Sequence, residues 1–183
     1  MEQKSVLAER LRRIGFRCIQ CGSCCREISP GSNVIMICPE EIRNISLATG
    51  NVPNEISDPF PDSIDFSDGL QVTFEWCLKR KNGTCIFAEE HRCSIYLKRP
   101  WICHTFPFAL EGTKLLISDC PGIGLPMGYD ESISLAGDLI QRSSHEEKEN
   151  LKIQDLMTKS KIPDADLVVI DGEGFTCIKK SEN

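Results

Sequence analysis

Four cysteines stand within eight positions of the chain, in the stretch FRCIQCGSCCRE at residues 16–27. The first three, Cys18, Cys21 and Cys24, are spaced C-x-x-C-x-x-C. Thiols three positions apart in a loop can turn toward one centre, because the backbone between them curls around a metal and donates N–H groups to the sulfurs. This spacing, completed by a distant cysteine, is typical of [4Fe–4S] ferredoxins. Zinc sites also use C-x-x-C, usually as two separated pairs.

The fourth cysteine of this run, Cys25, directly follows Cys24. Adjacent side chains of an extended loop point in different directions, so we expect the two thiols to serve two different metal centres. A distant cluster ligand is often followed by proline, and both Cys120 and Cys38 have that form. Eight thiols suit two four-coordinate centres. The candidate metal ligands are Cys18, Cys21, Cys24, Cys25, Cys85, Cys93, Cys103 and Cys120.

Composition limits the class of protein and its partners. The 183 residues are 40% hydrophobic and 26% charged, which is typical of a soluble chain long enough for a core. The net charge of −6 argues against nucleic acid and anionic membranes as partners, because both are polyanions. The N-terminus has no apolar stretch typical of a signal peptide, so we expect a cytoplasmic protein whose eleven cysteines are thiols. Disulfides are the minor alternative.

The remaining cysteines and the histidines are weaker candidates. Three cysteines suit buried apolar positions, and of these Cys77 is the strongest spare ligand. They are Cys38, Cys77 and Cys177. His104 is the one histidine whose ligation we would test, whereas His91 and His145 suit the surface.

Cationic side chains flank the cysteines of this otherwise acidic chain. A cation beside a thiol lowers its pKa and favours the ligating thiolate, although ordinary solvated charges would give the same pattern. We expect Arg99 and Pro100 to brace the cysteine loop. We expect the aromatic side chains of Trp101, Phe106 and Phe108 to shield the metal from water.

The flanking elements read as helices and short strands. Apolar spacing predicts a helix over residues 4–14 that Gly15 ends, and Pro39 and Gly50 suit the two ends of a second helix. Residues 51–69 hold three prolines and read as a surface loop. Strands are predicted at 33–37, 70–78, 85–87, 113–118, 167–170 and 175–178.

The chain changes character after about residue 125. Residues 133–140 have helical spacing, and Ser144 with Glu147 suggests the capping box of a second helix. We therefore predict a cysteine-cluster metal-binding domain over 1–125, with a mainly helical extension over 126–183 packed on it. The fold class is α+β, a small irregular cysteine-cluster core with short antiparallel strands, flanked by helices.

Several sequence blocks carry a family resemblance. The blocks CIQCGSCCR, GTCIF and CSIYLKRPWICHTFPF, followed by Cys120, resemble the CxxCxxCC (YkgJ-type) family of zinc- or iron-chelating cysteine-cluster domains. The resemblance runs from about Phe16 to about Cys120. It implies that the cysteines of these blocks, together with Cys120, are cluster or zinc ligands. The family commonly has arginine after the position of Cys103, where this chain has His104, which could ligate metal or donate to a cysteine sulfur.

These observations support three function hypotheses. The first is a cytoplasmic protein that holds one or two iron–sulfur clusters of the [4Fe–4S] type, for electron transfer with a protein partner or for cluster-dependent protein modification. The second is a structural zinc module for protein–protein interaction. The third is a methyltransferase-like enzyme, because the cysteine cluster resembles that of flagellin lysine methylase. No glycine-rich methyl-donor motif supports the third hypothesis.

Overall fold

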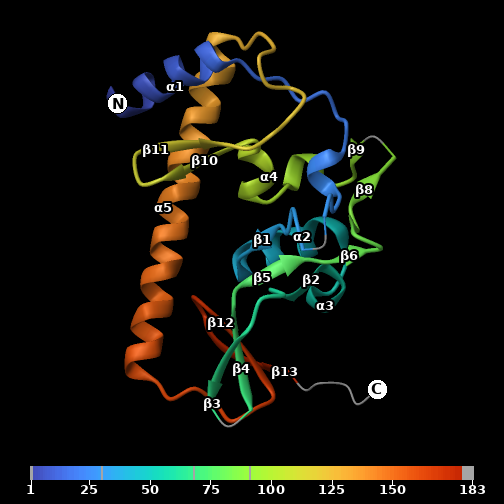
Figure 1. Ribbon diagram of the computed structural model, residues 1–183, viewed down its shortest axis with the longest axis vertical. Helices are drawn as coiled ribbons and strands as arrows, with labels where there is room; N and C mark the ends of the chain where they lie inside the picture. Colours follow the sequence, from blue (N-terminus) through green and yellow to red (C-terminus); the bar gives the residue numbers. More distant parts are fainter. Residues whose placement is uncertain (1, 30, 68, 91, 179–183) are drawn as a thin grey trace. The chain divides into compact units, whose positions relative to one another are not determined.

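The chain forms two compact units in the computed structural model (Figure 1). The first unit combines Met1–Arg26 with Phe87–Glu146, and the second combines Glu27–Ile86 with Glu147–Asn183. The boundaries between these units differ from the predicted boundary near residue 125. Residues 167–170 near the C-terminus pair with residues 71–74, so both segments belong to the second unit. The structure describes residues 2–29, 31–67, 69–90 and 92–178.

The core of the first unit lies between two helices and a hairpin. Helix α1 spans Glu2–Ile14, and helix α5 spans Tyr129–Lys159, of which residues 129–146 belong to this unit. The hairpin pairs β10 (Phe108–Glu111) with β11 (Lys114–Ile117). These elements bury the apolar side chains of Ala8, Leu11, Phe108, Leu115, Ala136 and Leu139.

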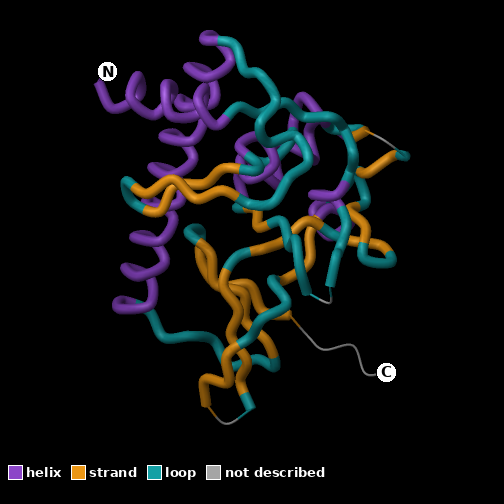
Figure 2. Tube along the Cα trace, turned by 45° about the horizontal axis from the view of Figure 1, so that its top comes forward, coloured by secondary structure: helices purple, strands orange, loops and turns teal. Residues whose placement is uncertain are grey.

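The cysteine-bearing part of the first unit has little regular structure, and Figure 2 shows how much of the chain is loop and turn. Its elements are single turns and two-residue strands, which bury few side chains by themselves. They are η1 (Ser23–Cys25), β8 (Ala88–Glu89), β9 (Arg92–Cys93), η2 (Tyr96–Lys98) and α4 (Trp101–Thr105).

A four-stranded sheet in the order β13-β12-β4-β3 forms the centre of the second unit (Figure 1). Strand β12 is parallel to β4, and the other two pairs are antiparallel. The side chains of Val72, Val168 and Ile170 pack against Ile153 of helix α5. The strands are β3 (Ile64–Ser67), β4 (Leu70–Phe74), β12 (Leu167–Asp171) and β13 (Gly174–Ile178).

The rest of the second unit consists of two short helices, a small sheet and a hairpin. Three strands pair in the order β1-β5-β2, and β6 pairs with β7 around the Asn82-Gly83 turn. The elements are β1 (Met36–Ile37), α2 (Pro39–Thr49), α3 (Pro53–Ile56), β2 (Ser57–Pro59), β5 (Trp76–Leu78), β6 (Arg80–Lys81) and β7 (Thr84–Cys85).

This architecture confirms the predicted α+β class and most of the predicted elements. Helix α1 ends where Gly15 adopts φ 74° and its N–H reaches the Leu11 carbonyl, and Gly50 ends helix α2 at φ 78°. Glycine adopts this left-handed conformation without the steric cost that a Cβ would add. The terminal hairpin β12–β13 matches the last two predicted strands.

Three of the predicted elements were wrong. The single strand predicted over 70–78 is divided at Glu75, whose φ of 66° separates β4 from β5, and these two strands belong to different sheets. The predicted loop over 51–69 contains α3, β2 and β3, because Pro53 begins a helical turn and the Glu55 carboxylate accepts the Val52 N–H at 3.1 Å. The two helices predicted after residue 130 are the single helix α5. Neither glycine nor proline interrupts residues 138–162, so nothing in the sequence stops the helix near Ser144.

No helix in the described part of the chain has both the length and the apolar character that spanning a membrane requires.

Candidate metal centre

The backbone holds Cys18 beside the turn that carries Cys120. Phe16 and Ile123 form an antiparallel bridge, and the Arg17 N–H donates to the Gly122 carbonyl at 3.0 Å. Cys18 therefore lies two residues after Phe16, and Cys120 lies three residues before Ile123. The contact requires glycine at position 122, because a Cβ there would overlap the Arg17 carbonyl oxygen. The local cysteine run and the Cys120-Pro121 segment thus lie in one unit, and their ligation of one metal stays a prediction.

A tight turn shapes the end of the cysteine run. Gly22 adopts φ 73° and accepts the Cys25 N–H at 3.0 Å, which begins the 3-10 turn η1. The sulfurs of Cys24 and Cys25 lie 3.9 Å apart. The expectation that this stretch is extended was therefore wrong, because the turn brings the adjacent thiols together. Their assignment to two different centres stays a prediction.

Neighbouring thiols of the first unit raise the pKa of one another. Contact with Cys25 and then burial raise the pKa of the Cys24 thiol. Burial raises the pKa of the Cys120 thiol, and the charges of Cys21, Cys24 and Cys18 raise it further. Several thiolates this close together disfavour one another unless a cation offsets their charge. A thiol-binding metal ion is such a cation.

The side chains of Arg99 and Ser23 instead lower the pKa of a nearby thiol. Burial raises the pKa of the Cys93 thiol, while the charge of Arg99 lowers it. The Arg99 guanidinium lies 3.6 Å from the centre of the Tyr96 ring, and its Nε donates to the Tyr96 carbonyl at 2.9 Å. These contacts fix the position of the Arg99 guanidinium against Tyr96, and its bracing of the cysteine loop stays a prediction. A hydrogen bond with the Ser23 side chain lowers the pKa of the Cys21 thiol.

The last two candidate ligands lie in different units. Cys103 belongs to helix α4 of the first unit and is half-buried. Cys85 belongs to strand β7 of the second unit, where it is buried and pairs in register with Arg80. The first unit therefore contains seven of the eight candidate ligands: Cys18, Cys21, Cys24, Cys25, Cys93, Cys103 and Cys120.

Helix α5 supports helix α4 through a pair of side chains that sequence reasoning missed. Arg142 Nη1 donates to Thr105 Oγ1 at 2.8 Å, and Thr105 Oγ1 donates to the Trp101 carbonyl at 3.0 Å. Thr105 is fully buried, and the Arg142 side chain is only 12% exposed. Glu146 accepts a second bond from Arg142 at 2.7 Å. The helix turn that carries Cys103 is therefore held by a residue 37 positions beyond Thr105.

The remaining cysteines lie in the second unit. Cys38 is buried at the start of helix α2, and burial raises the pKa of its thiol to about 12. Cys77 is buried in β5 and donates to the carbonyls of Asp58 and Pro59 at 3.5 and 3.6 Å. Both match the expected buried thiols, whereas Cys177 is exposed on β13.

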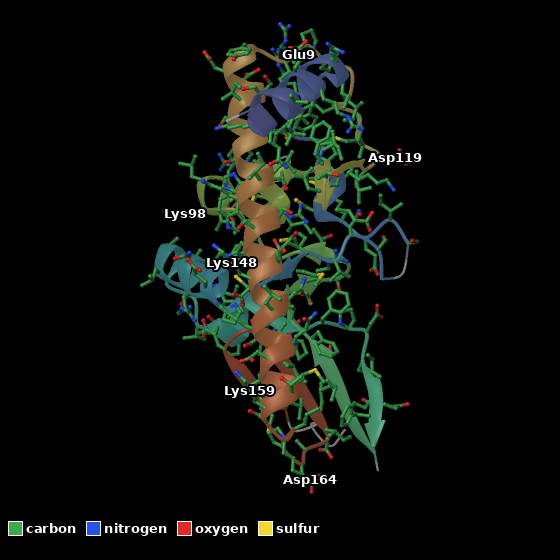
Figure 3. All side chains as sticks on the ribbon, turned by 90° about the vertical axis from the view of Figure 1, so that its left-hand side faces the viewer. Glu9, Lys98, Asp119, Lys148, Lys159 and Asp164 are labelled. Carbon is green, nitrogen blue, oxygen red and sulfur yellow. The ribbon has the colours of Figure 1, made fainter. Side chains whose placement is uncertain are left out.

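Two of the three histidines lie in helices of the first unit. The His104 ring in α4 lies 6.4 Å from the Trp101 ring. His145 is half-buried in helix α5, and His91 lies outside the described residues. Figure 3 labels Lys98 and Asp119, two exposed charges that follow Cys93 and precede Cys120 in the chain. Across the residues that the structure describes, no three His, Cys, Asp or Glu side chains converge closely enough to hold a metal ion.

The donor set nevertheless has the chemistry of a thiolate metal centre. Cysteine sulfur suits both zinc and iron–sulfur clusters, and all eight candidate ligands are cysteines. The α+β architecture and this cysteine-rich donor set are typical of a small cysteine-cluster protein.

Comparison with known families gives the same class. Residues 17–121 match the CxxCxxCC family, described as a "putative zinc- or iron-chelating domain". The match covers more than half of the chain, and the protein belongs to this family. No curated protein and no solved structure matches the chain. Residues 122–183, including all of helix α5 and the hairpin β12–β13, lie beyond the family match.

Proposed function

We propose that this protein is a cytoplasmic iron–sulfur protein that exchanges electrons with a protein partner or supports a cluster-dependent protein modification. The observation that carries the proposal is the bridge between Phe16 and Ile123, which holds the C-x-x-C-x-x-C run beside the distant Cys-Pro at Cys120. A local run of three cysteines plus a distant fourth is the ligand pattern of [4Fe–4S] ferredoxins.

The cluster would be held by thiolates and would supply one-electron redox chemistry. Cys18, Cys21, Cys24 and Cys120 suit one centre, since the first three precede the Gly22–Cys25 turn or lie in it and the fourth lies beside the bridge. Cys25, Cys93 and Cys103, which also lie in the first unit, are the candidates for a second. The guanidinium of Arg99 would offset thiolate charge near Cys24 and Cys93.

The test is metal and acid-labile sulfide analysis, with a visible spectrum, on protein purified without oxygen. Two [4Fe–4S] clusters require about eight irons and about eight sulfides per chain, with brown colour. Zinc in place of iron, with a colourless sample after iron and sulfide reconstitution, would contradict the proposal and favour a structural zinc module.

Matched serine variants sharpen the test. Cys24→Ser removes a half-buried thiol that contacts Cys25, and we expect it to reduce the iron content and the absorbance near 400 nm. Cys177→Ser removes an exposed thiol on β13, and we expect both quantities to stay unchanged. Equal iron loss in the two variants would count against the assigned ligands.

A further inference from the structure

The two units differ in charge. The first unit contains eleven Lys and Arg against ten Asp and Glu, a net charge of +1. The second contains ten against seventeen, a net charge of −7. Within the second unit, residues 44–78 hold six acidic residues and no basic residue. A surface with one sign of charge attracts partners of the opposite sign and raises their association rate.

Strand β3 lies in this acidic stretch and forms one edge of the four-stranded sheet. Ile64 pairs in register with Val72, and Val72 pairs with Val168, so the three side chains form one row across the sheet. Val72 and Val168 are buried in the core, but Ile64 is 59% exposed. The apolar row therefore continues to the open edge, where an added strand would cover it.

A β-bulge presents a second apolar side chain at the same edge. The register shifts between Asp65 and Ser67, so Phe66 has no partner in β4. Bulges commonly re-aim a side chain, and Phe66 is 53% exposed. The neighbouring carboxylates of Asp62 and Asp65 are also exposed. Asp65 accepts a hydrogen bond from Gln71 Nε2 at 3.2 Å.

We propose that the β3 edge, defined by Asp62, Ile64, Asp65 and Phe66, is a docking surface for an extended basic segment of another protein. The segment would alternate apolar residues, which cover Ile64 and Phe66, with lysine or arginine, which faces the aspartates. Exposed strand edges pair with extended peptides, and alternate side chains then determine specificity. The charge of the surface selects against an acidic partner.

This inference is independent of the metal centre. The four residues lie in the second unit, and none is a candidate metal ligand. A variant of this edge can therefore lose peptide binding while its metal content stays normal.

The test is fluorescence anisotropy of a short labelled peptide of alternating lysine and valine, titrated with the full chain at low salt. The matching glutamate–valine peptide is the control ligand. We expect Phe66→Ser and Ile64→Ser each to weaken binding about tenfold, the ratio that about 1.4 kcal/mol produces. We expect Asp65→Asn to weaken it by a smaller factor, which disappears at high salt.

Two variants of helix α5 in the same unit are matched controls. Leu151→Ser removes an apolar side chain that is 58% exposed, close to the exposure of Ile64. Asp155→Asn removes one exposed negative charge, which Lys159 partners. We expect neither to weaken binding more than about twofold.

Three results would overturn the proposal. Equal weakening by the control variants would mean that the peptide does not recognise the β3 edge in particular. Tight binding of the glutamate–valine peptide would contradict basic selectivity. Self-association of the chain that Phe66→Ser abolishes, measured by light scattering, would assign the edge to a second copy instead.

Discussion

The cysteine loops of the first unit and the four-stranded sheet of the second unit are ordered by different interactions. The sheet buries Val72, Val168 and Ile170 between hydrogen-bonded strands. The cysteine-bearing loops of the first unit contain only single turns and two-residue strands, and two of their thiols, Cys18 and Cys21, are exposed. Loops with so little buried apolar surface gain stability from a bound metal, whereas the sheet does not require one.

Both units also gather groups of like charge, with different outcomes. In the second unit Glu75 lies at the corner between β4 and β5, and burial, followed by the charges of Asp171 and Glu149, raises the pKa of its carboxyl to about 7. Protonation can therefore neutralise Glu75 without any ligand. In the first unit the neutralising group would be the metal. We therefore expect metal removal to change the stability of the first unit, and a change of pH to change the stability of the second.

The largest effect of a single substitution is expected at Gly122. Gly122→Ala places a Cβ on the Arg17 carbonyl oxygen, so the bridge that holds Cys18 beside Cys120 must open. We expect a loss of about 3 kcal/mol in the free energy of unfolding of the first unit, together with loss of metal. Urea unfolding and metal analysis measure the two effects.

Gly112→Ala is the control for this substitution. Gly112 adopts φ 59°, and a Cβ there would meet no atom within 4 Å. Gly112→Ala should lower the free energy of unfolding by about 1 kcal/mol through backbone strain alone, and it should leave the metal content unchanged. A similar effect of the two substitutions would show that the bridge does not organise the site.

A smaller effect is expected at Arg142. Arg142→Gln removes the charged donor of a hydrogen bond to the buried Thr105 hydroxyl. We expect the free energy of unfolding to fall by about 2 kcal/mol and the α4 turn that carries Cys103 to become less ordered. Metal affinity, measured by competition with a chelator, should fall, and Arg142→Lys should restore part of it. The exposed Arg13, which pairs with Glu9, is the control, and Arg13→Gln should leave both quantities unchanged. Equal effects at the two positions would contradict the bracing role.

The smallest effect is expected at Glu75, and it has the opposite sign. The unfolded chain releases the Glu75 proton near pH 4.5, whereas the folded chain retains it to about pH 7, so its contribution to stability falls as pH rises between these values. Glu75→Gln should therefore stabilise the second unit by about 1–2 kcal/mol at pH 8, after allowance for solvent screening, and by little at pH 4.5.

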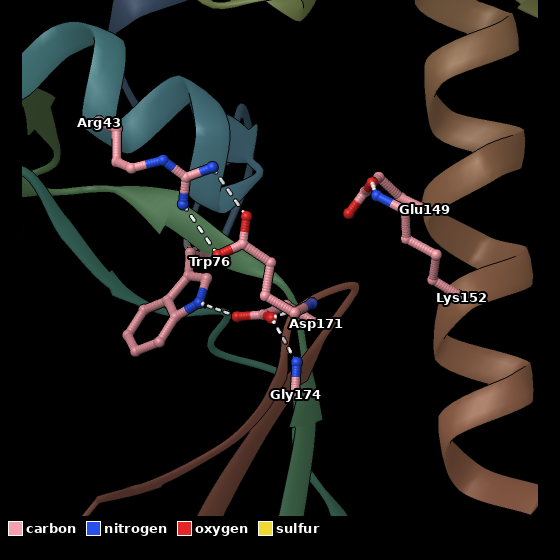
Figure 4. A network of polar contacts seen from close by, with 7 residues as sticks. Arg43, Trp76, Glu149, Lys152, Asp171 and Gly174 are labelled. Atoms are coloured by element: carbon pink, nitrogen blue, oxygen red, sulfur yellow. Dashed lines mark hydrogen bonds and ion pairs between the residues drawn. The ribbon is translucent and has the colours of Figure 1, made fainter.

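Thermal unfolding of the wild type and the variant at the two pH values measures this difference. The charged groups that face Glu75 are Asp171, Glu149, Glu41 and Lys152, and none of them changes in the variant. Figure 4 shows Asp171 accepting the Trp76 indole N–H, with Glu149 and Lys152 on helix α5 nearby. A stabilisation that is equal at both pH values would mean that the charge of Glu75 is not its cause.

Much of the fold followed from local sequence signals. Gly15 and Gly50 ended their helices as predicted, because a helix end in the left-handed conformation favours glycine. Strand β3 could not be predicted, because Ile64 and Phe66 are exposed and three prolines and two aspartates of the same segment precede Ile64. Helix α5 was predicted as two helices because the side chains of Ser144 and Glu147 resemble a cap that the continuing helix does not use.

Less of the candidate site than of the fold could be predicted from the sequence. Cysteine spacing indicated which thiols could ligate metal, since ligand spacing is a local property. The contact of Arg17 with Gly122 and the bond from Arg142 to Thr105 join distant parts of the chain, and no local pattern identifies such pairs. The 3-10 turn at Cys24 and Cys25 had one local signal, the preceding Gly22, which sequence analysis did not use.

The most direct test of the account is hydrogen–deuterium exchange of the anaerobically purified protein, before and after the metal is removed with a chelator. We predict that metal removal speeds exchange of amides at residues 17–26 and 92–106 at least tenfold, while amides of β4 and β12 stay protected. Unchanged exchange at residues 17–26, or equal loss of protection in β4 and β12, would contradict a metal centre that organises the cysteine loops of the first unit.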